Sequence, residues 1–320
     1  MAKSRKTGSS KEKKSSKKVK KKNRDSFVLK AVLIALAAIA VVVIGNLPGM
    51  PFAVTDKDLS PRADYTGSCV FDFIDVGQGD STLITTPSGE FILVDTGTSD
   101  TDDLMDYLVH AGVDNIEYLI LTHPHEDHIG GAVKVLKKYD VGCVIMPDVI
   151  QTDSLFNRLY DALMDEKKDG CKVYSAAPGD KYEIDGCNID IVGPVECNKD
   201  ALNNCSVSMT FTYKDFTALL TGDSEADAEK LMLSSGARLD CDLYKAAHHG
   251  SNTSNTAEFL AAASPDITVV SCGKDNSYGH PHDEVLKRFE DIGSEIYITA
   301  KNGSVTVITD GDGYDVDKEK

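Results

Sequence analysis

The run His-Pro-His-Glu-Asp-His at 123–128 constrains this chain more than any other stretch, because it gathers three of the eight histidines around two carboxylates. It follows a short apolar run that predicts a buried strand, so it lies where a strand passes into a loop. Neutral imidazole and carboxylate are ligands that zinc, manganese and iron accept. His123 and His125 can converge on one ion, and Asp127 and His128 can reach a neighbouring ion. A polar loop that only solvates the strand end is the alternative, but residue types and spacing favour metal binding.

Polar residues follow other predicted strands in the same way. Asp223 comes after the strand predicted at 215–221 and before the helix predicted at 225–233. It could cap that helix, but beside the histidine run we interpret it as a carboxylate that bridges two ions about 4 Å apart. The histidine pair 248–249 follows the strand predicted at 242–247. Strands that end in ligand residues define one rim, where loops on a rigid scaffold can assemble a site.

Hydrophobic periodicity predicts alternating strands and helices along the folded part of the chain. Strands are predicted at 70–76, 81–86, 91–95, 116–122, 141–146, 172–175, 181–184, 187–192, 207–213, 215–221, 242–247 and 267–271. Helices are predicted at 102–112, 131–139, 154–168, 225–233, 255–263 and 285–292. The first three strands form a meander, and the repeated pattern indicates an α/β layered domain. The segments 295–299 and 304–309 are predicted to pair as a hairpin across Asn302-Gly303.

The sequence predicts a tail, a transmembrane helix and a linker before this domain, and a short tail after it. Residues 1–26 are rich in Lys, Ser and Gly and are expected to be disordered. The apolar run 27–47 is long enough to cross a hydrocarbon layer of roughly 30 Å, and the basic residues before it predict a cytoplasmic N-terminus. A cleaved signal peptide is the alternative. A linker is predicted at 48–68, a folded extracytoplasmic domain at 69–312 and a charged tail at 313–320.

The formal charge of −17 conceals an asymmetry. Residues 1–24 hold twelve of the 34 basic residues and one of the 51 acidic residues, which leaves 22 basic and 50 acidic residues, a charge of −28, for the rest. A field of this sign repels polyanions unless bound metal or a local basic patch overrides it. The composition therefore counts against a loose, sequence-independent nucleic-acid binder.

The eight cysteines are scattered, with no Cys-x-x-Cys pair and none beside the histidine run, so they do not indicate a zinc ribbon. Cys143 and Cys272 lie in apolar runs and are predicted to be buried thiols. One or two disulfides fit an extracytoplasmic domain, and the sequence does not pair them.

Seven motifs together resemble one known family. Beside the histidine run, they are Asp-Val-Gly-Gln-Gly-Asp at 75–80, Asp-Thr-Gly at 95–97, Asn-Asn-Cys-Ser at 203–206, Thr-Gly-Asp at 221–223, His-His-Gly-Ser at 248–251 and Tyr-Gly-His-Pro at 278–281. The set is similar to the metallo-hydrolase domain attached to the ComEC/Rec2 competence proteins, within the metallo-β-lactamase superfamily. The resemblance spans residues 69 to about 310. It implies an αββα metallo-β-lactamase sandwich, here behind a single N-terminal transmembrane helix, with a site for two metal ions between the sheet edges.

The resemblance also implies a set of metal ligands for two divalent ions, zinc or manganese. His123 and His125 would hold the first ion, Asp127, His128 and His249 the second, and Asp223 would lie between them. His248 is the alternative to His249. We favour His249, with His248 facing the substrate, because the run around Asp223 followed by paired histidines is similar to the phosphorylcholine esterases of this superfamily.

The chain departs from the hydrolytic β-lactamases at one position. Where those enzymes supply a third histidine to the first ion, this chain offers Asn203 and Asn204 and has no histidine between His128 and His248. The first site is therefore expected to be weaker or more open, which makes manganese conceivable there. Both asparagines, together with Glu225, are expected to contact the substrate.

These expectations lead to a metal-dependent hydrolase of a phosphodiester or related ester outside the membrane, with a nuclease as one form. Two ions lower the pKa of a bridging water and stabilise the oxyanion that forms on attack. Asp127 is expected to orient the nucleophile, and His280 either donates a proton to the leaving group or contacts the substrate. The alternatives are a noncatalytic metal-containing binding or sensor module, and a hydrolase of a cell-wall phosphoester such as phosphorylcholine. One anchor excludes a DNA-translocating pore.

Overall fold

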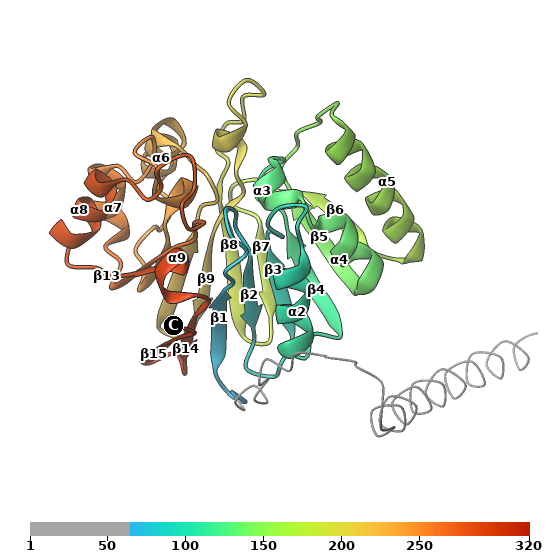
Figure 1. Ribbon diagram of the computed structural model, residues 1–320, viewed down its shortest axis with the longest axis horizontal. Coiled ribbons are helices and arrows are strands. Elements are labelled where there is room, and N and C mark those ends of the chain that lie inside the picture. Colours follow the sequence, from blue (N-terminus) through green and yellow to red (C-terminus); the bar gives the residue numbers. More distant parts are fainter. Residues whose placement is uncertain (1–64) are drawn as a thin grey trace, which may run out of the picture. The chain divides into compact units, whose positions relative to one another are not determined.

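The computed structural model describes residues 65–320 (Figure 1). The expected N-terminal tail and transmembrane helix, 1–26 and 27–47, lie outside the described residues, as does most of the expected linker. Within residues 65–320, none of the helices has the length and apolar character needed to cross a membrane.

Two β-sheets form the centre of the fold. In order across the sheet, the eight-stranded sheet comprises β15 (Tyr314–Lys318), β14 (Val305–Thr309), β1 (Cys69–Phe73), β2 (Thr82–Thr85), β3 (Phe91–Val94), β4 (Asn115–Ile120), β5 (Asp140–Met146) and β6 (Lys172–Ser175). The seven-stranded sheet comprises β13 (Glu295–Ile298), β12 (Ile267–Val270), β11 (Leu243–Lys245), β10 (Phe216–Leu220), β9 (Ser208–Tyr213), β8 (Cys187–Gly193) and β7 (Lys181–Ile184). The first three strands are antiparallel neighbours, so the expected meander is confirmed.

Helices cover the outer face of each sheet (Figure 1). The eight-stranded sheet packs against α2 (Asp102–His110), α4 (Ala132–Lys138) and α5 (Ser154–Asp169), with the short α3 (Glu126–Ile129) beside them. The seven-stranded sheet packs against α6 (Ala226–Ser235), α7 (Ala257–Ala263) and α8 (Asp283–Asp291). The remaining short helices are η1 (Leu202–Cys205), η2 (Ala247–Gly250) and α9 (Thr299–Asn302). The order of layers is the predicted αββα sandwich.

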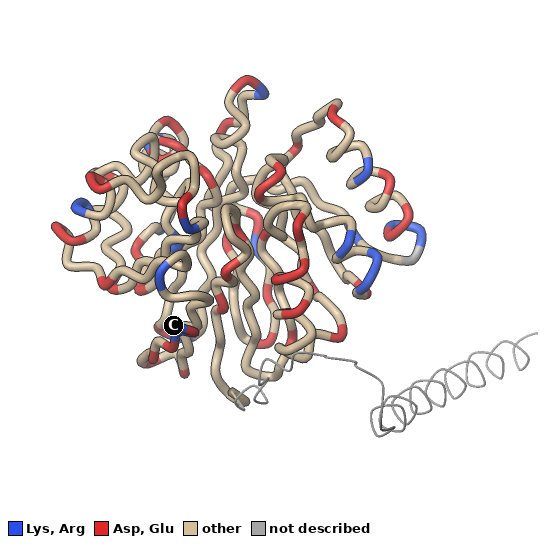
Figure 2. Tube along the Cα trace, viewed as in Figure 1, with Lys and Arg blue, Asp and Glu red and all other residues tan. Residues whose placement is uncertain are grey.

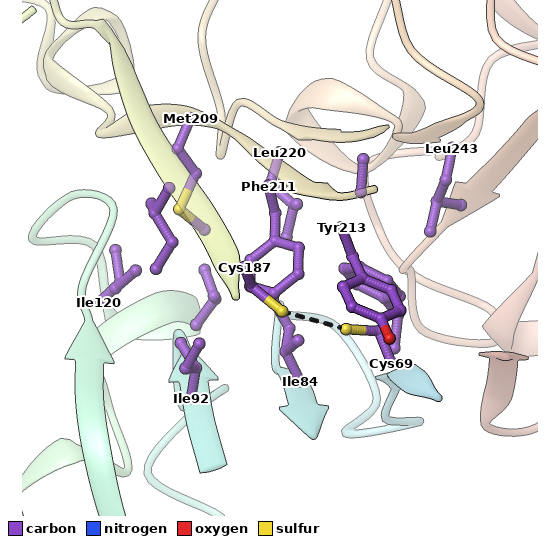
Figure 3. Packing of buried hydrophobic residues seen from close by; sticks show 14 of the residues in the cluster. Cys69, Ile84, Ile92, Ile120, Cys187, Met209, Phe211, Tyr213, Leu220 and Leu243 are labelled. Carbon is purple, nitrogen blue, oxygen red and sulfur yellow. Dashed lines mark hydrogen bonds between the residues drawn. The ribbon is translucent and has the colours of Figure 1, made fainter. Parts of the chain in front are cut away.

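Alternation along each strand sends neighbouring side chains to different layers. On β3, Ile92 and Val94 enter the core between the sheets, whereas Leu93 packs under the helices. The central core includes aromatic pairs: the ring of Phe71 on β1 lies edge-on to Phe211 on β9, with 5.3 Å between centroids. Figure 3 shows part of this core. These contacts join the two sheets and fix the geometry of their rims.

Replacing Phe71 with alanine is expected to lower the free energy of unfolding by about 3–5 kcal/mol, because the substitution leaves a cavity in a closely packed core. Urea denaturation of the full chain measures the change. Val109→Ala on α2 is the control, because Val109 is 57% exposed and its truncation should change stability by less than about 0.5 kcal/mol. Equal effects of the two substitutions would show that Phe71 does not join the sheets.

The six free cysteines are buried, as predicted for Cys143 and Cys272. The structure contains one disulfide among residues 65–320, between Cys197 and Cys205. The thiols of Cys69 and Cys187, from opposite sheets, lie 3.3 Å apart in the central core (Figure 3).

The C-terminal part of the prediction was wrong. The segments predicted as a hairpin across Asn302-Gly303 belong to different sheets, since β13 pairs with β12 and β14 pairs with β1. Helix α9 carries the chain from one sheet to the other. Val305 and Val307 are fully buried in the central core, which explains why β14 leaves its sequence neighbour.

The expected charged tail at 313–320 is also corrected. Residues Tyr314–Lys318 form β15, which pairs antiparallel with β14 at the edge of the eight-stranded sheet. Its alternating charges resemble a solvated tail in the sequence, but charged residues are also the usual protection of an edge strand. The folded domain therefore continues to the C-terminal strand.

Candidate metal centre

The ligand residues meet because the strands before them end at the same rim. β3 and β4 are parallel neighbours in one sheet, and β10 and β11 are parallel neighbours in the other. Carboxyl ends of parallel strands share one edge, so the loops that follow these strands come together. The two rims then meet: His128 Nε2, from the first sheet, lies 3.3 Å from Asp223 Oδ2, from the second.

One carboxylate oxygen occupies the middle of the cluster. Asp223 Oδ2 lies within 4 Å of the Nε2 atoms of four histidines: His128 at 3.3 Å, His248 at 3.7 Å, His249 at 3.7 Å and His123 at 3.8 Å. The helix-cap alternative does not describe this position, because the N-cap residue of α6 is Glu225. The carboxylate of Asp223 therefore lies among all four histidine rings.

One group of candidate ligands includes Asp223, and the histidines at 123 and 125 lie next to it. Asp127, His128, Asp223 and His249 each offer an atom, and these atoms lie within 4.8 Å of one another. On the other side, His123 Nε2 lies 3.0 Å from His125 Nδ1. The arrangement is a candidate dinuclear centre of the kind that the sequence predicted.

Unpaired polar atoms indicate that the cluster fits cations. Within residues 65–320, His128 Nε2 and Asp223 Oδ1 are buried and have no hydrogen-bond partner. A buried polar atom without a partner is destabilising by about 1–3 kcal/mol, so native structures seldom leave one unexplained. Imidazole nitrogen and carboxylate oxygen around a shared carboxylate are the donor set that divalent zinc or manganese accepts.

Hydrogen bonds behind the histidines orient their rings. His128 Nδ1 lies 2.8 Å from Asp95 Oδ2, which also accepts a hydrogen bond from Thr122 Oγ1. His249 Nδ1 lies 3.0 Å from the carbonyl oxygen of Ser271. With Nδ1 as the donor in each case, the lone pair of Nε2 faces Asp223. Such outer partners are typical of metal-binding histidines, and Asp95 was not among the predicted site residues.

The electrostatics of the cluster favour a positive guest. Burial opposes the charged form of Asp223, but His128 and His249 outweigh it and hold the pKa of that carboxyl well below its usual range. Burial also opposes protonation of His249, but Asp223 and Asp80 raise its pKa to about 10. Burial and His128 lower the pKa of His123. The negative charge that raises the pKa of His249 also attracts a metal ion, which competes with the proton for the ring.

The two neighbouring histidines differ in environment. The side chain of His249 is 2% exposed, and its Nε2 lies 3.2 Å from Asp127 Oδ2. The side chain of His248 is 21% exposed, and its Nδ1 lies 3.2 Å from Thr253 Oγ1 and 3.5 Å from Glu225 Oε1. His249 therefore belongs to the buried group, whereas His248 lies toward its open side.

The three residues expected to contact substrate form one hydrogen-bonded group beside His248. Asn203 Nδ2 donates to Glu225 Oε1 at 3.4 Å, and Thr253 Oγ1 donates to the same oxygen at 3.0 Å. The side chain of Asn204 instead accepts a bond from the backbone N–H of Glu225 at 2.9 Å. Asn204 thus fixes the start of α6, and Glu225 lies beside His248.

His280 lies on a loop at the edge of the cluster. Its ring is 5.6 Å from that of His248 and is stacked on His249 at 6.0 Å between centroids. Burial, with His249 and His248, lowers its pKa to about 4, so the ring is neutral at neutral pH. Tyr278, which is 65% exposed, is also stacked on His280, with 5.6 Å between ring centroids. Aromatic rings therefore continue from the buried histidines to the surface.

Acidic residues outnumber basic residues along the described chain. Figure 2 shows acidic segments on both flanks of the described chain and fewer basic ones.

With the fold and the cluster in place, comparison with known proteins defines the class. The family model of the metallo-β-lactamase superfamily matches residues 74–274. The chain belongs to the metallo-β-lactamase superfamily, and this family and fold support a metal-dependent hydrolase. CmlA, a diiron β-hydroxylase from Streptomyces venezuelae, shares the fold with a TM-score of 0.50 at 14% identity, over 73% of this chain and 53% of that one.

Competence proteins are among the relatives, as the motifs predicted. ComE operon protein 3 of Bacillus subtilis is 27% identical over 252 residues, which are 73% of this chain and 32% of that protein. Recombination protein 2 of Haemophilus influenzae is 30% identical over 242 residues, 74% of this chain and 28% of that protein. Competence protein ComA of Neisseria gonorrhoeae is 29% identical, over 72% of this chain and 31% of that protein. The chain spans about a third of the length of these relatives.

Proposed function

We propose that this chain is a membrane-anchored, extracytoplasmic phosphodiesterase that uses two divalent metal ions, zinc or manganese. The observation that carries the proposal is the position of Asp223 Oδ2 among the Nε2 atoms of four buried or half-buried histidines. Structural zinc sites are closed by their protein ligands, whereas this cluster has an open side at His248. The apolar run 27–47 supports the anchor.

In this proposal, the ligands are those that the resemblance implied. His123 and His125 hold the first ion, Asp127, His128 and His249 the second, and Asp223 joins the two groups. His249 is preferred to His248 because it is buried and lies beside Asp127. The first group has no third histidine, so it is the more open of the two.

When bound, two ions supply an activated water and charge stabilisation for a phosphoryl group. The residues of the chain do the rest. We assign Asp127 to orienting the attacking water as well as to metal binding, since its side chain is 29% exposed and its Oδ1 lies 4.0 Å from His128 Nε2. We assign His248, whose side chain is 21% exposed, and Asn203 to hydrogen bonds with substrate oxygens. His280 is neutral, so we assign it to substrate contact in preference to proton donation.

A diester is preferred as substrate because of the competence-type relatives. DNA is one candidate and a small or wall-linked phosphodiester, including phosphorylcholine esters, is another. The excess of acidic residues counts against a long polyanion bound by charge alone. A noncatalytic sensor would need no open coordination position, and this weighs against that alternative.

Substrate class is tested with the full chain in detergent, supplied with zinc or manganese. The assay compares bis-p-nitrophenyl phosphate, p-nitrophenyl phosphate and p-nitrophenyl phosphorylcholine. Preference for the first supports a general phosphodiesterase, and preference for the third points to the phosphorylcholine ester. Preference for the monoester, or no turnover of any of them with metal bound, would contradict the proposal.

Tyr278 is predicted to bind a nucleobase if the substrate is a nucleotide, because its exposed ring continues the stack above His280. Base stacking on an aromatic ring contributes about 1–3 kcal/mol. Tyr278→Ala should therefore lower kcat/KM at least about 5-fold for thymidine 5′-p-nitrophenyl phosphate, but not for ethyl p-nitrophenyl phosphate. Tyr160→Ala, at another exposed tyrosine, is the control. Equal losses with both substrates would exclude base stacking.

A further inference from the structure

Lys245 is a buried cation beneath the proposed metal centre. It is the last residue of β11, and its side chain is 3% exposed. No other lysine among residues 65–320 is buried. Lysine is almost never fully buried unless it has a partner. Its Nζ donates to Asp80 Oδ2 at 2.6 Å and to the carbonyl oxygen of Ala246 at 2.9 Å. The partner, Asp80, is also buried.

Asp80 connects this lysine to the proposed ligands. Its Oδ1 lies 3.2 Å from His249 Nδ1, on the side of the ring away from Asp223. Its backbone N–H donates to the carbonyl oxygen of Asp127 at 3.0 Å. Its backbone carbonyl accepts from the N–H of Gly97, in the loop after β3. One residue thus touches the loops of two proposed ligands of the same ion.

The approach of these loops is close enough to require glycine. A Cβ at Gly79, which has a φ of +154°, would lie 2.6 Å from the carbonyl oxygen of Asp127. The turn before Asp80 is therefore packed directly against the backbone of a proposed ligand. A shift of Asp80 would be transmitted to Asp127 and to His249.

Asp80, Asp95 and His128 also form a group whose ligand atoms lie within 4.8 Å of one another. In this group the partners are already supplied from within the chain: Lys245 contacts Asp80, and the Nδ1 of His128 contacts Asp95. The group therefore supports the metal centre and is not itself a third metal site.

We propose that the Lys245–Asp80 pair is a positioning device for the metal centre. The ammonium group fixes Asp80 Oδ2, so that the negative Oδ1 stays 3.2 Å from His249 Nδ1. There it reinforces the tautomer that the contact of Nδ1 with the Ser271 carbonyl oxygen favours, in which the Nε2 lone pair faces the metal. The same pair joins the two sheets, because Lys245 lies in the seven-stranded sheet and Asp80 precedes β2 of the other. The inference rests on the ligand assignment in the proposed function, not on the reaction.

The test measures metal binding and not hydrolysis. The full chain, Lys245→Met and Asp80→Asn are titrated with cobalt(II) against a chelating dye, and the visible absorption of bound cobalt is recorded. Each variant is expected to bind cobalt about 10–100-fold more weakly and to show a shifted absorption band, as for other outer partners of metal ligands. The double variant should be no weaker than the weaker single variant, because both substitutions break one unit.

Lys181→Met is the matched control, since it removes a lysine from an exposed pair with Asp190, in which Nζ lies 2.8 Å from Oδ1. It should leave affinity and absorption unchanged. If Lys245→Met does not fold, Asp80→Asn decides the question, because it keeps the shape of the side chain. Folded variants with unaltered affinity and absorption would overturn the inference. A chain that binds cobalt normally but hydrolyses no phosphodiester would defeat the proposed function and leave this inference standing.

Discussion

Asp223→Asn is expected to lower kcat/KM for a phosphodiester by at least about 10³-fold, a loss of about 4 kcal/mol of transition-state stabilisation. The reason is its central position, since its Oδ2 faces four imidazole nitrogens and its Oδ1 has no partner among residues 65–320. Asparagine keeps the shape but removes the negative charge that would hold two cations together. The measurement is hydrolysis of bis-p-nitrophenyl phosphate at saturating metal.

Asp215→Asn is the control for Asp223→Asn. It removes an exposed carboxylate from the turn between β9 and β10, and β10 is the strand that precedes Asp223. It should leave kcat/KM within about 2-fold of the unmodified chain, since an exposed substitution changes little. The metal content of Asp223→Asn shows whether a loss of activity comes with a loss of bound metal. Loss of bound metal together with activity agrees with a shared ligand, whereas full activity in Asp223→Asn would exclude that role.

The second large effect distinguishes the paired histidines. His249→Ala should lose both bound metal and activity, by at least about 10³-fold, because its buried ring belongs to the ligand group with Asp127. His248→Ala should retain the metal and lower kcat by about 10²-fold, as expected for a group that contacts the reacting substrate. Metal content by mass spectrometry and kcat are measured on the same samples. The reverse pattern would assign His248 as the ligand.

Much of the centre could be predicted because its chemistry is local in the sequence. The histidine run contains four proposed ligands within six residues, directly after an apolar strand. Asp223 and the pair at 248–249 follow strands in the same manner. The parallel pairing of those strands, which the strand and helix pattern indicates, then brings distant loops to one rim.

Contacts between distant segments were not predictable in the same way. Lys245 lies in an apolar strand, and its partner Asp80 is 165 residues away, so neither residue signals the pair. Asp80 and Asp95 do lie in motifs that the sequence singled out, but only the fold shows that they stand behind His249 and His128. The hairpin predicted across Asn302-Gly303 was wrong for the same reason. The turn residues are a local signal, whereas the pairing of β14 with β1 is a contact between distant segments.

The account depends most directly on whether two metal ions support hydrolysis. The full chain, stripped with a chelator, is titrated with zinc or manganese while bound metal and turnover of bis-p-nitrophenyl phosphate are followed together. We expect no turnover without metal, and turnover that rises to its maximum as the second equivalent binds. Turnover without metal, or two bound equivalents without turnover of any phosphodiester, would contradict the account.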